Sequence, residues 1–545
     1  MIFNKIKVFI FILLSILNNL FNPKHLIKNL KLLLQIRKLL RNRKPFLSKK
    51  KNGKKAVVYC YGDFFFILLQ SFHIIALNRL GYTVIGLLGS YNFSVEYLYK
   101  KFGVDRFDYI LPHYLNQKKE NIKFNKIDTV EKLKRFSYKK IPVGKVTLST
   151  TMRFLKKNRF TKEEFNLVSN KLTESIRFVD TYNFYLRKNK PHIIIMLDRG
   201  YTPAAELFEV AIQKGIECVE VHLSHRADFL TFKRYNNNNK LMHFNSLSDN
   251  SWNKIKKQKF DIKYERSFFD ELNFCYKTGR WYEEVGTQYK KIFLSRDKFY
   301  SSFGLNKNLK TAVLFSHIFW DGTFFYGDDL FIDYEDWFKQ TINKMINNNK
   351  LNWLVKVHPA NKVKDVRDKK SNFAEFNALN EITKKLPQHI KFVNSDSKVS
   401  TLSYFNYIDY CITVRGTVGI EAACFGIPVI TAGTGRYDGR GFTKDHKNKQ
   451  DYLRTIENLH NLNIDTKKTK EIAIKYAYNL YVCRTFKTNF INFYFEADNL
   501  NTMRYNILNN LKNEIFDSVN IEKLMKWYLS GDEDYFESKK YKYTL

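Results

Sequence analysis

The chain has 545 residues, more than one ordinary hydrophobic core organises, so at least two domains are expected. Hydrophobic residues make up 44% of the chain and aromatic residues 16%, which excludes a globally disordered protein. Its 92 basic and 53 acidic residues give a net charge of +39, which indicates either an anionic partner or a general drift of the composition toward lysine. Because the lysines are scattered and no RNA- or DNA-binding module is recognisable, no specific nucleic-acid partner is expected.

The six cysteines indicate a reducing compartment. They include no C-x-x-C pair, and several lie in apolar stretches, such as Cys411 in IDYCITV and Cys424 in EAACFG. Cysteines in such stretches behave as small buried hydrophobic residues. We therefore predict neither disulfides nor a cysteine metal site.

Residues 1–50 are a basic, apolar segment. Val8–Leu14 is an unbroken apolar run, but it is shorter than the roughly 20 residues that a spanning helix needs. The stretch His25–Lys44 repeats leucine at helical spacing with Lys and Arg interleaved, a pattern typical of helices that lie on anionic membranes. The alternative is a helix packed on the N-terminal domain. Whether the segment spans the membrane or lies on it is left open, and association with an anionic membrane surface is the expectation.

Residues 51–300 are predicted to form a Rossmann-like domain with a helical insertion. KAVVYCY is a strand that ends at Gly62-Asp63, the apolar run after it is a helix closed by Gly81, and YTVIGLL is the next strand. Residues 92–190 are mostly helical in pattern. A second unit follows, with the strand HIIIML, a helix over Pro203–Gly215 and the strand IECVEVHL. Strands that alternate with helices predict a parallel sheet.

The same pattern restarts near Lys310, so residues 301–450 are predicted to form a second Rossmann-like domain. Its strands are KTAVLFSH, NWLVKVHP, IDYCITV and PVITAG, and residues 451–545 are predicted to be a helical tail. In open α/β sheets, ligands bind at the carboxyl ends of the strands. The polar clusters of this chain follow predicted strands, which favours an enzyme cleft between two domains.

The motif with the most specific chemistry is Ile412–Phe442. Arg415-Gly416 is a turn between a strand and a helix, Thr417 is a natural N-cap, and the helix N-terminus can hold a phosphate. Glu421, four residues later on the same helix face, can accept hydrogen bonds from ribose hydroxyls. The simpler interpretation is that Thr417 only caps the helix and that Glu421 only complements its dipole.

Lys356 and His358 end another predicted strand. Pro359 holds His358 in an extended conformation, and Lys356 lies two residues earlier on the same face, so both side chains can converge on an anion. The segment Ser316–Trp337 places His317 and Asp321, which are also candidates for binding the donor, and further acids among aromatic residues. Three well-placed ligands are not evident in it, so no metal is expected.

The first predicted domain carries the candidates for proton transfer. Asp198 and His225 follow neighbouring strands and are the candidate bases, because sugar transfer requires a group that takes a proton from the acceptor hydroxyl. Asp63, Arg226 and Asp228 follow strands of the same domain and are candidates for the acceptor side. A structural His–Asp hydrogen bond is the alternative for Asp198 and His225.

The strings HLSHRADFLTFKRY, FSHIFWDGTFFYGDDLFIDYEDW, KVHPAN and RGTVGIEAACFGIPVITAGTGRYDGRGF resemble the bacterial capsule-polysaccharide biosynthesis proteins, which are related to the Kdo transferases of capsule assembly. The resemblance implies a GT-B fold, with two Rossmann-like domains around a cleft, and a nucleotide-sugar donor in the C-terminal domain. His358 and Thr417 would bind its phosphates, supported by Lys356 and Arg415, and Glu421 would bind the ribose. Arg415-Gly416-Thr417 stands where related motifs often have a serine pair, and no QxxxD-like motif matches, so Kdo as the sugar is not supported.

The resemblance further implies a glycosyltransferase that works without a bound metal or other cofactor, at the cytoplasmic face of the inner membrane. Its partners would be a nucleotide-sugar and a glycan or glycolipid acceptor of the capsule or lipopolysaccharide type, bound by the N-terminal domain. Two alternatives remain. One is another GT-B reaction, such as polyol-phosphate transfer or sugar-nucleotide epimerisation, and the other is a non-catalytic, membrane-associated assembly protein.

Overall fold

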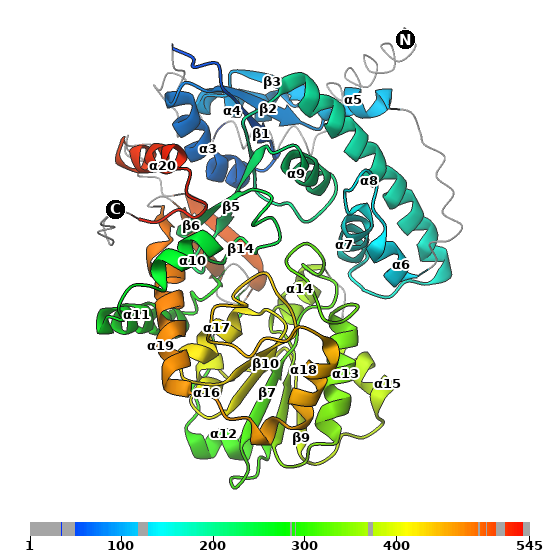
Figure 1. Ribbon diagram of the computed structural model, residues 1–545, viewed down its shortest axis with the longest axis vertical. Coiled ribbons are helices and arrows are strands. Elements are labelled where there is room, and N and C mark those ends of the chain that lie inside the picture. Colours follow the sequence, from blue (N-terminus) through cyan, green and yellow to red (C-terminus); the bar gives the residue numbers. More distant parts are fainter. Residues whose placement is uncertain are drawn as a thin grey trace.

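The computed structural model describes Leu34 and residues 50–117, 129–283, 286–288, 290–368, 374–488, 491–496, 499–507 and 518–537. Most of the basic segment predicted for residues 1–50 therefore lies outside the described residues. Over the ranges just given, no helix combines the length and the apolar character needed to cross a bilayer. The described chain forms two α/β domains, one above the other in Figure 1, each built on its own sheet.

The upper domain is built on a seven-stranded sheet in the order β12-β6-β5-β4-β1-β2-β3. Strands β1 to β5 are parallel, and in the register Val57 of β1 lies beside both Ile85 of β2 and Ile194 of β4. Its elements are β1 (Lys55–Tyr59), α3 (Phe64–Arg79), β2 (Thr83–Leu88), α4 (Phe93–Phe102), β3 (Arg106–Tyr109), α5 (Ile110–Asn116), α6 (Val130–Arg135), α7 (Val143–Leu155), α8 (Lys162–Asn189), β4 (Ile193–Met196), α9 (Ala204–Gln213), β5 (Glu217–Leu223), β6 (Phe229–Tyr235), α10 (Asp249–Ile255) and α11 (Ile262–Thr278).

The lower domain is built on a five-stranded parallel sheet in the order β11-β10-β7-β8-β9. Its central strand β7 places Val313 between Leu354 of β8 and Cys411 of β10. Its elements are α12 (Arg296–Phe303), β7 (Thr311–Phe315), α13 (Tyr334–Ile346), β8 (Asn352–Lys356), α14 (Ala360–Asp368), α15 (Ala374–Ile382), β9 (Ile390–Val393), α16 (Thr401–Phe405), β10 (Tyr410–Thr413), α17 (Thr417–Cys424), β11 (Val429–Thr431), α18 (Lys449–Glu457), η2 (Leu459–Asn461), α19 (Thr466–Ala477) and η3 (Tyr478–Cys483).

After η3 the chain returns to the upper domain (Figure 1). Strand β12 (Phe486–Lys487) pairs with β6, and helix α20 (Ser518–Ser530) packs on α3. The tail was predicted to be helical, and the structure adds β12 and the hairpin of β13 (Ile491–Glu496) and β14 (Asn499–Ile507) to its helices. The chain therefore crosses between the domains twice, once after α11 and once after η3.

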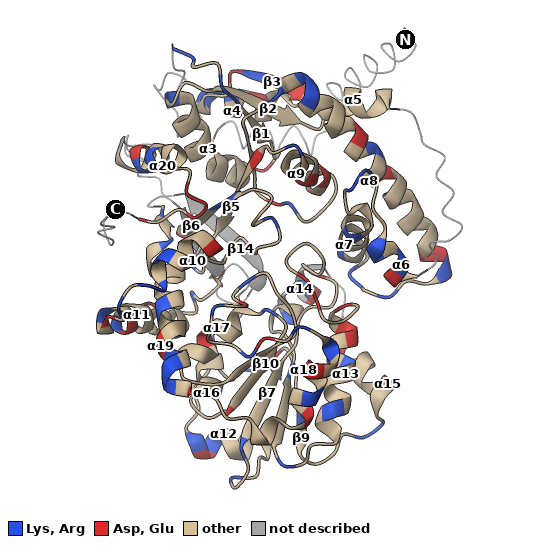
Figure 2. Cartoon of the chain, viewed as in Figure 1, with Lys and Arg blue, Asp and Glu red and all other residues tan. Residues whose placement is uncertain are grey.

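Sequence patterns account for most of these elements. The apolar run after Asp63 forms α3, whose N-cap is Asp63 and which is buried between the sheet and α20. All six cysteines are free and buried, as predicted. Figure 2 shows Lys and Arg spread over the helices of both domains and not gathered on one element. The predicted fold class, with two parallel α/β units in tandem, is confirmed.

Candidate active site

A cavity of about 440 Å³ lies between the two domains, at the carboxyl ends of strands from both sheets. The upper domain contributes Leu223 and Ser224, which end β5, and the lower domain contributes the segments that follow β7, β8 and β10. All eight residues predicted to bind the donor line this cavity: His317, Asp321, Lys356, His358, Arg415, Gly416, Thr417 and Glu421. The structure therefore brings together residues that lie up to 104 positions apart in the sequence, from His317 to Glu421.

The N-terminus of α17 opens onto the cavity. Gly416 is its N-cap and no side chain caps the helix, so the expectation that Thr417 is the N-cap is wrong; Thr417 is the first helical residue. The first N–H groups of a helix have no partners within the helix. Gly416, Thr417 and Val418 all line the cavity, and the Gly416 N–H donates to Thr413 Oγ1 at 3.2 Å. A side chain at Gly416 would place its Cβ 2.9 Å from Thr413 Oγ1, so glycine allows this turn to lie close against Thr413. The arrangement suits a phosphate group.

Three cationic side chains line the same cavity. Lys356 is 5% exposed and forms no ion pair with any described residue. Burial, together with the nearby Lys291, lowers the pKa of Lys356 to about 7. Arg415 is ion-paired with Asp329, and Arg436 donates from Nη1 to the Arg415 carbonyl at 3.4 Å. A buried lysine without a counter-ion is costly unless a ligand supplies the negative charge.

Each of the three histidines that line the cavity accepts a backbone hydrogen bond on one ring nitrogen, which leaves the other nitrogen to donate. His358 Nδ1 accepts from the Ala360 N–H at 3.2 Å, and His317 Nε2 accepts from the Val414 N–H at 3.2 Å. His243 Nδ1 accepts from the Asn245 N–H at 3.0 Å. Burial lowers the pKa of all three rings, so each is neutral and carries its proton on the other nitrogen. Each ring can therefore donate one N–H but cannot act as a base.

Glu421 lies in the first turns of α17 and is 2% exposed. Its carboxylate accepts a hydrogen bond from the Tyr276 hydroxyl of α11. Burial raises the pKa of Glu421, and the hydrogen bond from Tyr276 opposes that rise. A carboxylate beside a helix N-terminus that suits a phosphate can accept hydrogen bonds from the hydroxyls of a ribose.

Asp321 joins the two domains at the edge of the cavity. Its carboxylate is ion-paired with Arg153 of the upper domain and Lys364 of the lower one, and it accepts from the Tyr201 hydroxyl at 3.0 Å. Burial opposes ionisation, but the charges of Lys364 and Arg153 hold the pKa of Asp321 below its ordinary value. Because these partners already occupy its oxygens, Asp321 connects the domains at the cavity wall.

The predicted residues of the upper domain lie outside the cavity lining. Asp63 is exposed and caps α3, where it accepts from the Phe65 N–H at 2.9 Å. Asp198 accepts from the Gly200 N–H at 2.8 Å, and burial raises its pKa. No hydrogen bond joins Asp198 to His225 among the described residues.

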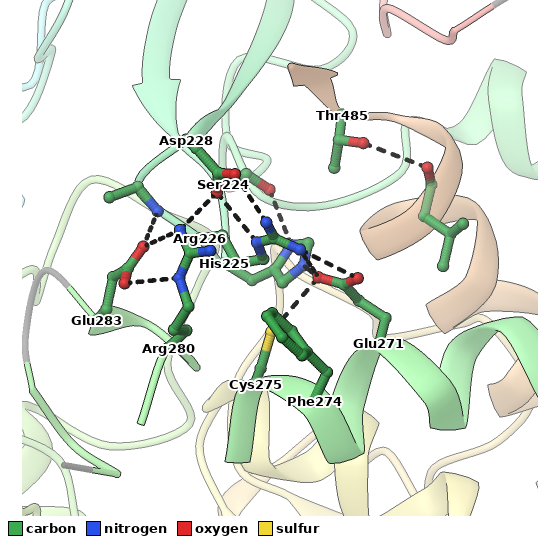
Figure 3. A network of polar contacts seen from close by, with 12 residues as sticks. Ser224, His225, Arg226, Asp228, Glu271, Phe274, Cys275, Arg280, Glu283 and Thr485 are labelled. Carbon is green, nitrogen blue, oxygen red and sulfur yellow. Dashed lines mark hydrogen bonds and ion pairs between the residues drawn. The ribbon is translucent and has the colours of Figure 1, made fainter. Parts of the chain in front are cut away.

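His225, Arg226 and Asp228 instead belong to a polar network between the loop after β5 and helix α11 (Figure 3). Arg226 binds Asp228 with two hydrogen bonds, at 2.7 and 3.0 Å, and also donates to Glu271 at 3.1 Å. Arg280 bridges Asp228 and Glu283. The network reaches the cavity through Ser224, a residue that the sequence analysis does not single out.

Several lining residues are absent from the predicted set. His243 and Arg436 lie in loops without a readable strand or helix pattern, and Tyr276 lies on an amphipathic helix far from the motifs. The string RYDGRGF contains Arg436 and was part of the motif, but its glycines suggest only turns. Tyr276 reaches the site through a hydrogen bond to Glu421, 145 positions later in the sequence, which no local pattern indicates.

Two Rossmann-like domains with a cavity at the facing carboxyl ends of their strands define a GT-B-like protein. Residues 283–477 match the family model described as capsule polysaccharide biosynthesis protein. This stretch contains every strand of the lower sheet and the helix α17. The region is thus similar to this family, in agreement with the resemblance of its motifs.

Several solved structures are similar to the chain at low identity. The KpsC beta-Kdo 2,4 transferase of Thermosulfurimonas dismutans is 14% identical, with 53% of this chain and 80% of that one covered and a TM-score of 0.32. The UDP-GlcNAc 2-epimerase of Neisseria meningitidis is 10% identical, with 78% and 97% covered and a TM-score of 0.27. A glycosyltransferase from Rickettsia africae is 12% identical, with 79% and 94% covered and a TM-score of 0.26. No curated protein matches the chain.

Proposed function

We propose that the chain is a glycosyltransferase that moves a sugar from a nucleotide-sugar donor to a growing glycan or glycolipid of the cell surface. The observation that carries the proposal is Lys356, buried without a counter-ion among the described residues, in the same cavity as the uncapped N-terminus of α17. Both features favour a bound anion, which none of the described side chains supplies to Lys356. The family match over residues 283–477 supports capsule polysaccharide as the product class.

In this proposal the donor lies along the lower domain. The N–H groups of α17, the His358 N–H and the Lys356 ammonium hold its phosphates, and Glu421 accepts from its ribose. As the bond between the anomeric carbon and the phosphate oxygen breaks, negative charge grows on the leaving phosphate. Fixed donors in a buried site stabilise that charge without reorganising. The proposed reaction calls for no cofactor beyond the nucleotide-sugar itself.

The acceptor binds from the upper domain, whose strand β5 ends at the cavity wall. The contacts of Asp321 with Arg153 and Tyr201 hold the two domains together around the cavity, which limits donor hydrolysis by water. The basic segment of residues 1–50 would place the enzyme at the anionic inner face of the cytoplasmic membrane, where lipid-linked acceptors are located.

The test is a turnover assay of the full-length protein. A panel of nucleotide-sugars is incubated with and without a capsule-type glycan acceptor, and the released nucleotide and the glycan mass are measured. The proposal predicts acceptor-dependent release with one donor, lost in Glu421→Ala and kept in Glu457→Ala, a carboxylate of α18 outside the cavity. A new sugar-nucleotide without acceptor would instead identify an epimerase, and a polyol-phosphate on the glycan a phosphotransferase. No product from any donor, with the nucleotide bound, would favour an assembly protein.

A further inference from the structure

The cavity holds three histidines, and none of them is available as a base. His243, His317 and His358 line the cavity, and each accepts a backbone N–H on one ring nitrogen, so each neutral ring carries its proton on the other nitrogen. A glycosyl transfer still requires a group that accepts the proton of the acceptor hydroxyl. On the upper-domain wall, Ser224 is 6% exposed and lines the cavity.

Ser224 is hydrogen-bonded to His225 in the network of Figure 3, with 3.3 Å between Ser224 Oγ and His225 Nδ1. On the opposite side of the ring, His225 Nε2 lies 2.9 Å from Glu271 Oε1. Burial would raise the pKa of Glu271, but the hydrogen bond from His225 and the charge of Arg226 lower it to about 2. An ionised carboxylate only accepts, so Nε2 carries the proton and Nδ1 offers its lone pair to the Ser224 hydroxyl.

His225 Nδ1 therefore directs its lone pair toward the hydroxyl of Ser224 at the upper-domain wall of the cavity. Burial lowers the pKa of His225, and the hydrogen bond that its Nε2 donates to Glu271 acts in the opposite direction, so the ring is neutral with Nδ1 unprotonated. The ring packs between Trp281 and Tyr481, at 5.2 and 5.3 Å between centroids. The charged and titratable groups that face it are Arg226 and Asp228 of its own loop, Glu271 and Cys275 of α11, Arg280 and Tyr282 of the segment after α11, and Tyr481 of η3.

The cluster is a hydrogen-bond network and not a cation site. Arg226 Nη1 donates to Glu271 Oε1 at 3.1 Å, and the Cys275 thiol donates to the same oxygen at 3.4 Å. Burial raises the pKa of Cys275, so its sulfur stays protonated. A metal cation bound to Glu271 would be repelled by the positive charge of Arg226.

We propose that Ser224, His225 and Glu271 form the proton relay that activates the acceptor hydroxyl, an inference that rests on the proposed glycosyl transfer. The acceptor oxygen forms a bond to the anomeric carbon while its proton passes to Ser224 Oγ. The Ser224 proton passes at the same time to His225 Nδ1, and the bond from the anomeric carbon to the phosphate oxygen breaks with its electron pair on the phosphate. Ser224 is then the catalytic residue that touches the acceptor, and Glu271 is a positioning residue that stabilises the imidazolium.

The kinetic test compares Ser224→Ala with Ser224→Thr, which keeps the hydroxyl. The relay predicts that Ser224→Ala lowers kcat by about 100-fold or more, with nucleotide affinity unchanged, and that Ser224→Thr restores most of the rate. Glu271→Gln removes the charge that raises the pKa of His225, so the acid limb of the kcat–pH profile moves to lower pH. Wild-type kcat and an unchanged pH profile in Ser224→Ala would overturn the relay.

A second measurement needs no turnover, so failure of the relay is distinguished from failure of the glycosyltransferase proposal. The full-length protein is labelled with ¹⁵N-histidine, and His225→Gln assigns the resonance of His225. The relay predicts a neutral ring protonated at Nε2, with an Nδ1 shift that changes in Ser224→Ala. A ring protonated at Nδ1, or charged near neutral pH, would overturn the relay whatever the enzyme assay shows.

Discussion

The Tyr276 hydroxyl donates a hydrogen bond to the Glu421 carboxylate, and so joins α11 to the first turns of α17. Both side chains are almost fully buried and both line the cavity between the domains. The bond fixes the direction of a carboxylate that burial alone would push toward its neutral form. Tyr276 thereby links the segment that leaves the upper domain to the proposed ribose contact.

Tyr276→Phe is expected to weaken nucleotide binding by roughly tenfold, the size of one hydrogen bond to a charged group. Without the hydroxyl, the pKa of Glu421 rises further, so the loss is larger at pH 6 than at pH 8. Calorimetric titration at the two pH values measures it. Tyr97→Phe, an exposed residue of α4, is the matched control. Equal losses at both pH values would show that the hydroxyl does not maintain the ionised carboxylate.

Lys356 gives the nucleotide site a pH dependence. Its pKa is about 7 in the folded protein, and a bound phosphate favours the charged ammonium. Affinity is therefore expected to fall as the pH rises through 7 toward 9. Lys356→Met is expected to bind more weakly at pH 6 and to lose this slope, as measured by titration across the range. A slope that persists in the variant would place the titrating group elsewhere.

The same substitution is expected to stabilise the fold. Lys356 has a lowered pKa in the folded protein, so its burial destabilises the fold at pH values where the unfolded chain keeps the charge. That penalty is fully present below pH 7 and fades as the pH approaches the ordinary lysine value. Lys356→Met should therefore raise the melting temperature more at pH 6 than at pH 10. An equal shift at both pH values would point to packing and not to charge.

Asp321→Asn removes the carboxylate shared by Arg153, Lys364 and Tyr201. Because Arg153 is partly exposed, the expected loss is on the order of 2 kcal/mol in the free energy of unfolding. Asp297→Asn breaks the exposed pair with Lys307 and is expected to leave the free energy of unfolding nearly unchanged, because solvent screens this pair. Denaturant unfolding of both variants makes the comparison. Equal stabilities would show that the Asp321 cluster does not hold the domains together.

Gly416→Ala tests the approach to α17. Its Cβ would lie 2.9 Å from Thr413 Oγ1 and 3.7 Å from His317 Cε1, so it crowds the groups around the helix N-terminus. Nucleotide affinity is expected to fall, with little change in melting temperature. Gly89→Ala, where the added Cβ meets nothing within 4 Å, is the control. Unchanged affinity in Gly416→Ala would remove the N-terminus of α17 from the proposed phosphate site.

The central strands and the lower-domain wall of the cavity are predictable from the sequence because local rules determine them. Apolar runs followed by polar or turn-forming residues give β1, β7, β8 and β10, and the polar residues after them meet at one edge of each sheet. Strand β6 was not predicted, because Lys233 interrupts its pattern. Lys233 is fully buried there because Asp534, 301 positions later, pairs with it at 2.8 Å.

The upper-domain wall of the cavity was not predictable either, because its contacts also join residues that are far apart in the sequence. His225 was predicted as a base from its place after a strand, but the ring lies behind Ser224, and its partner Glu271 is 46 positions away on α11. Helix spacing places Glu271 and Cys275 on one face of α11 but does not indicate what that face meets. The predicted N-cap, Thr417, lies one position too late, because Gly416 takes that position with its backbone alone.

The central claim is that the cavity between the domains holds the nucleotide of a sugar donor. Calorimetric titration of the full-length protein with CMP, CDP, UDP, GDP and dTDP tests it most directly, with Glu421→Ala and Glu457→Ala compared in parallel. The account predicts that one nucleotide binds selectively, that Glu421→Ala abolishes this binding, and that Glu457→Ala retains it. A folded protein that binds none of the five, or whose Glu421→Ala variant binds with unchanged affinity, would contradict the account.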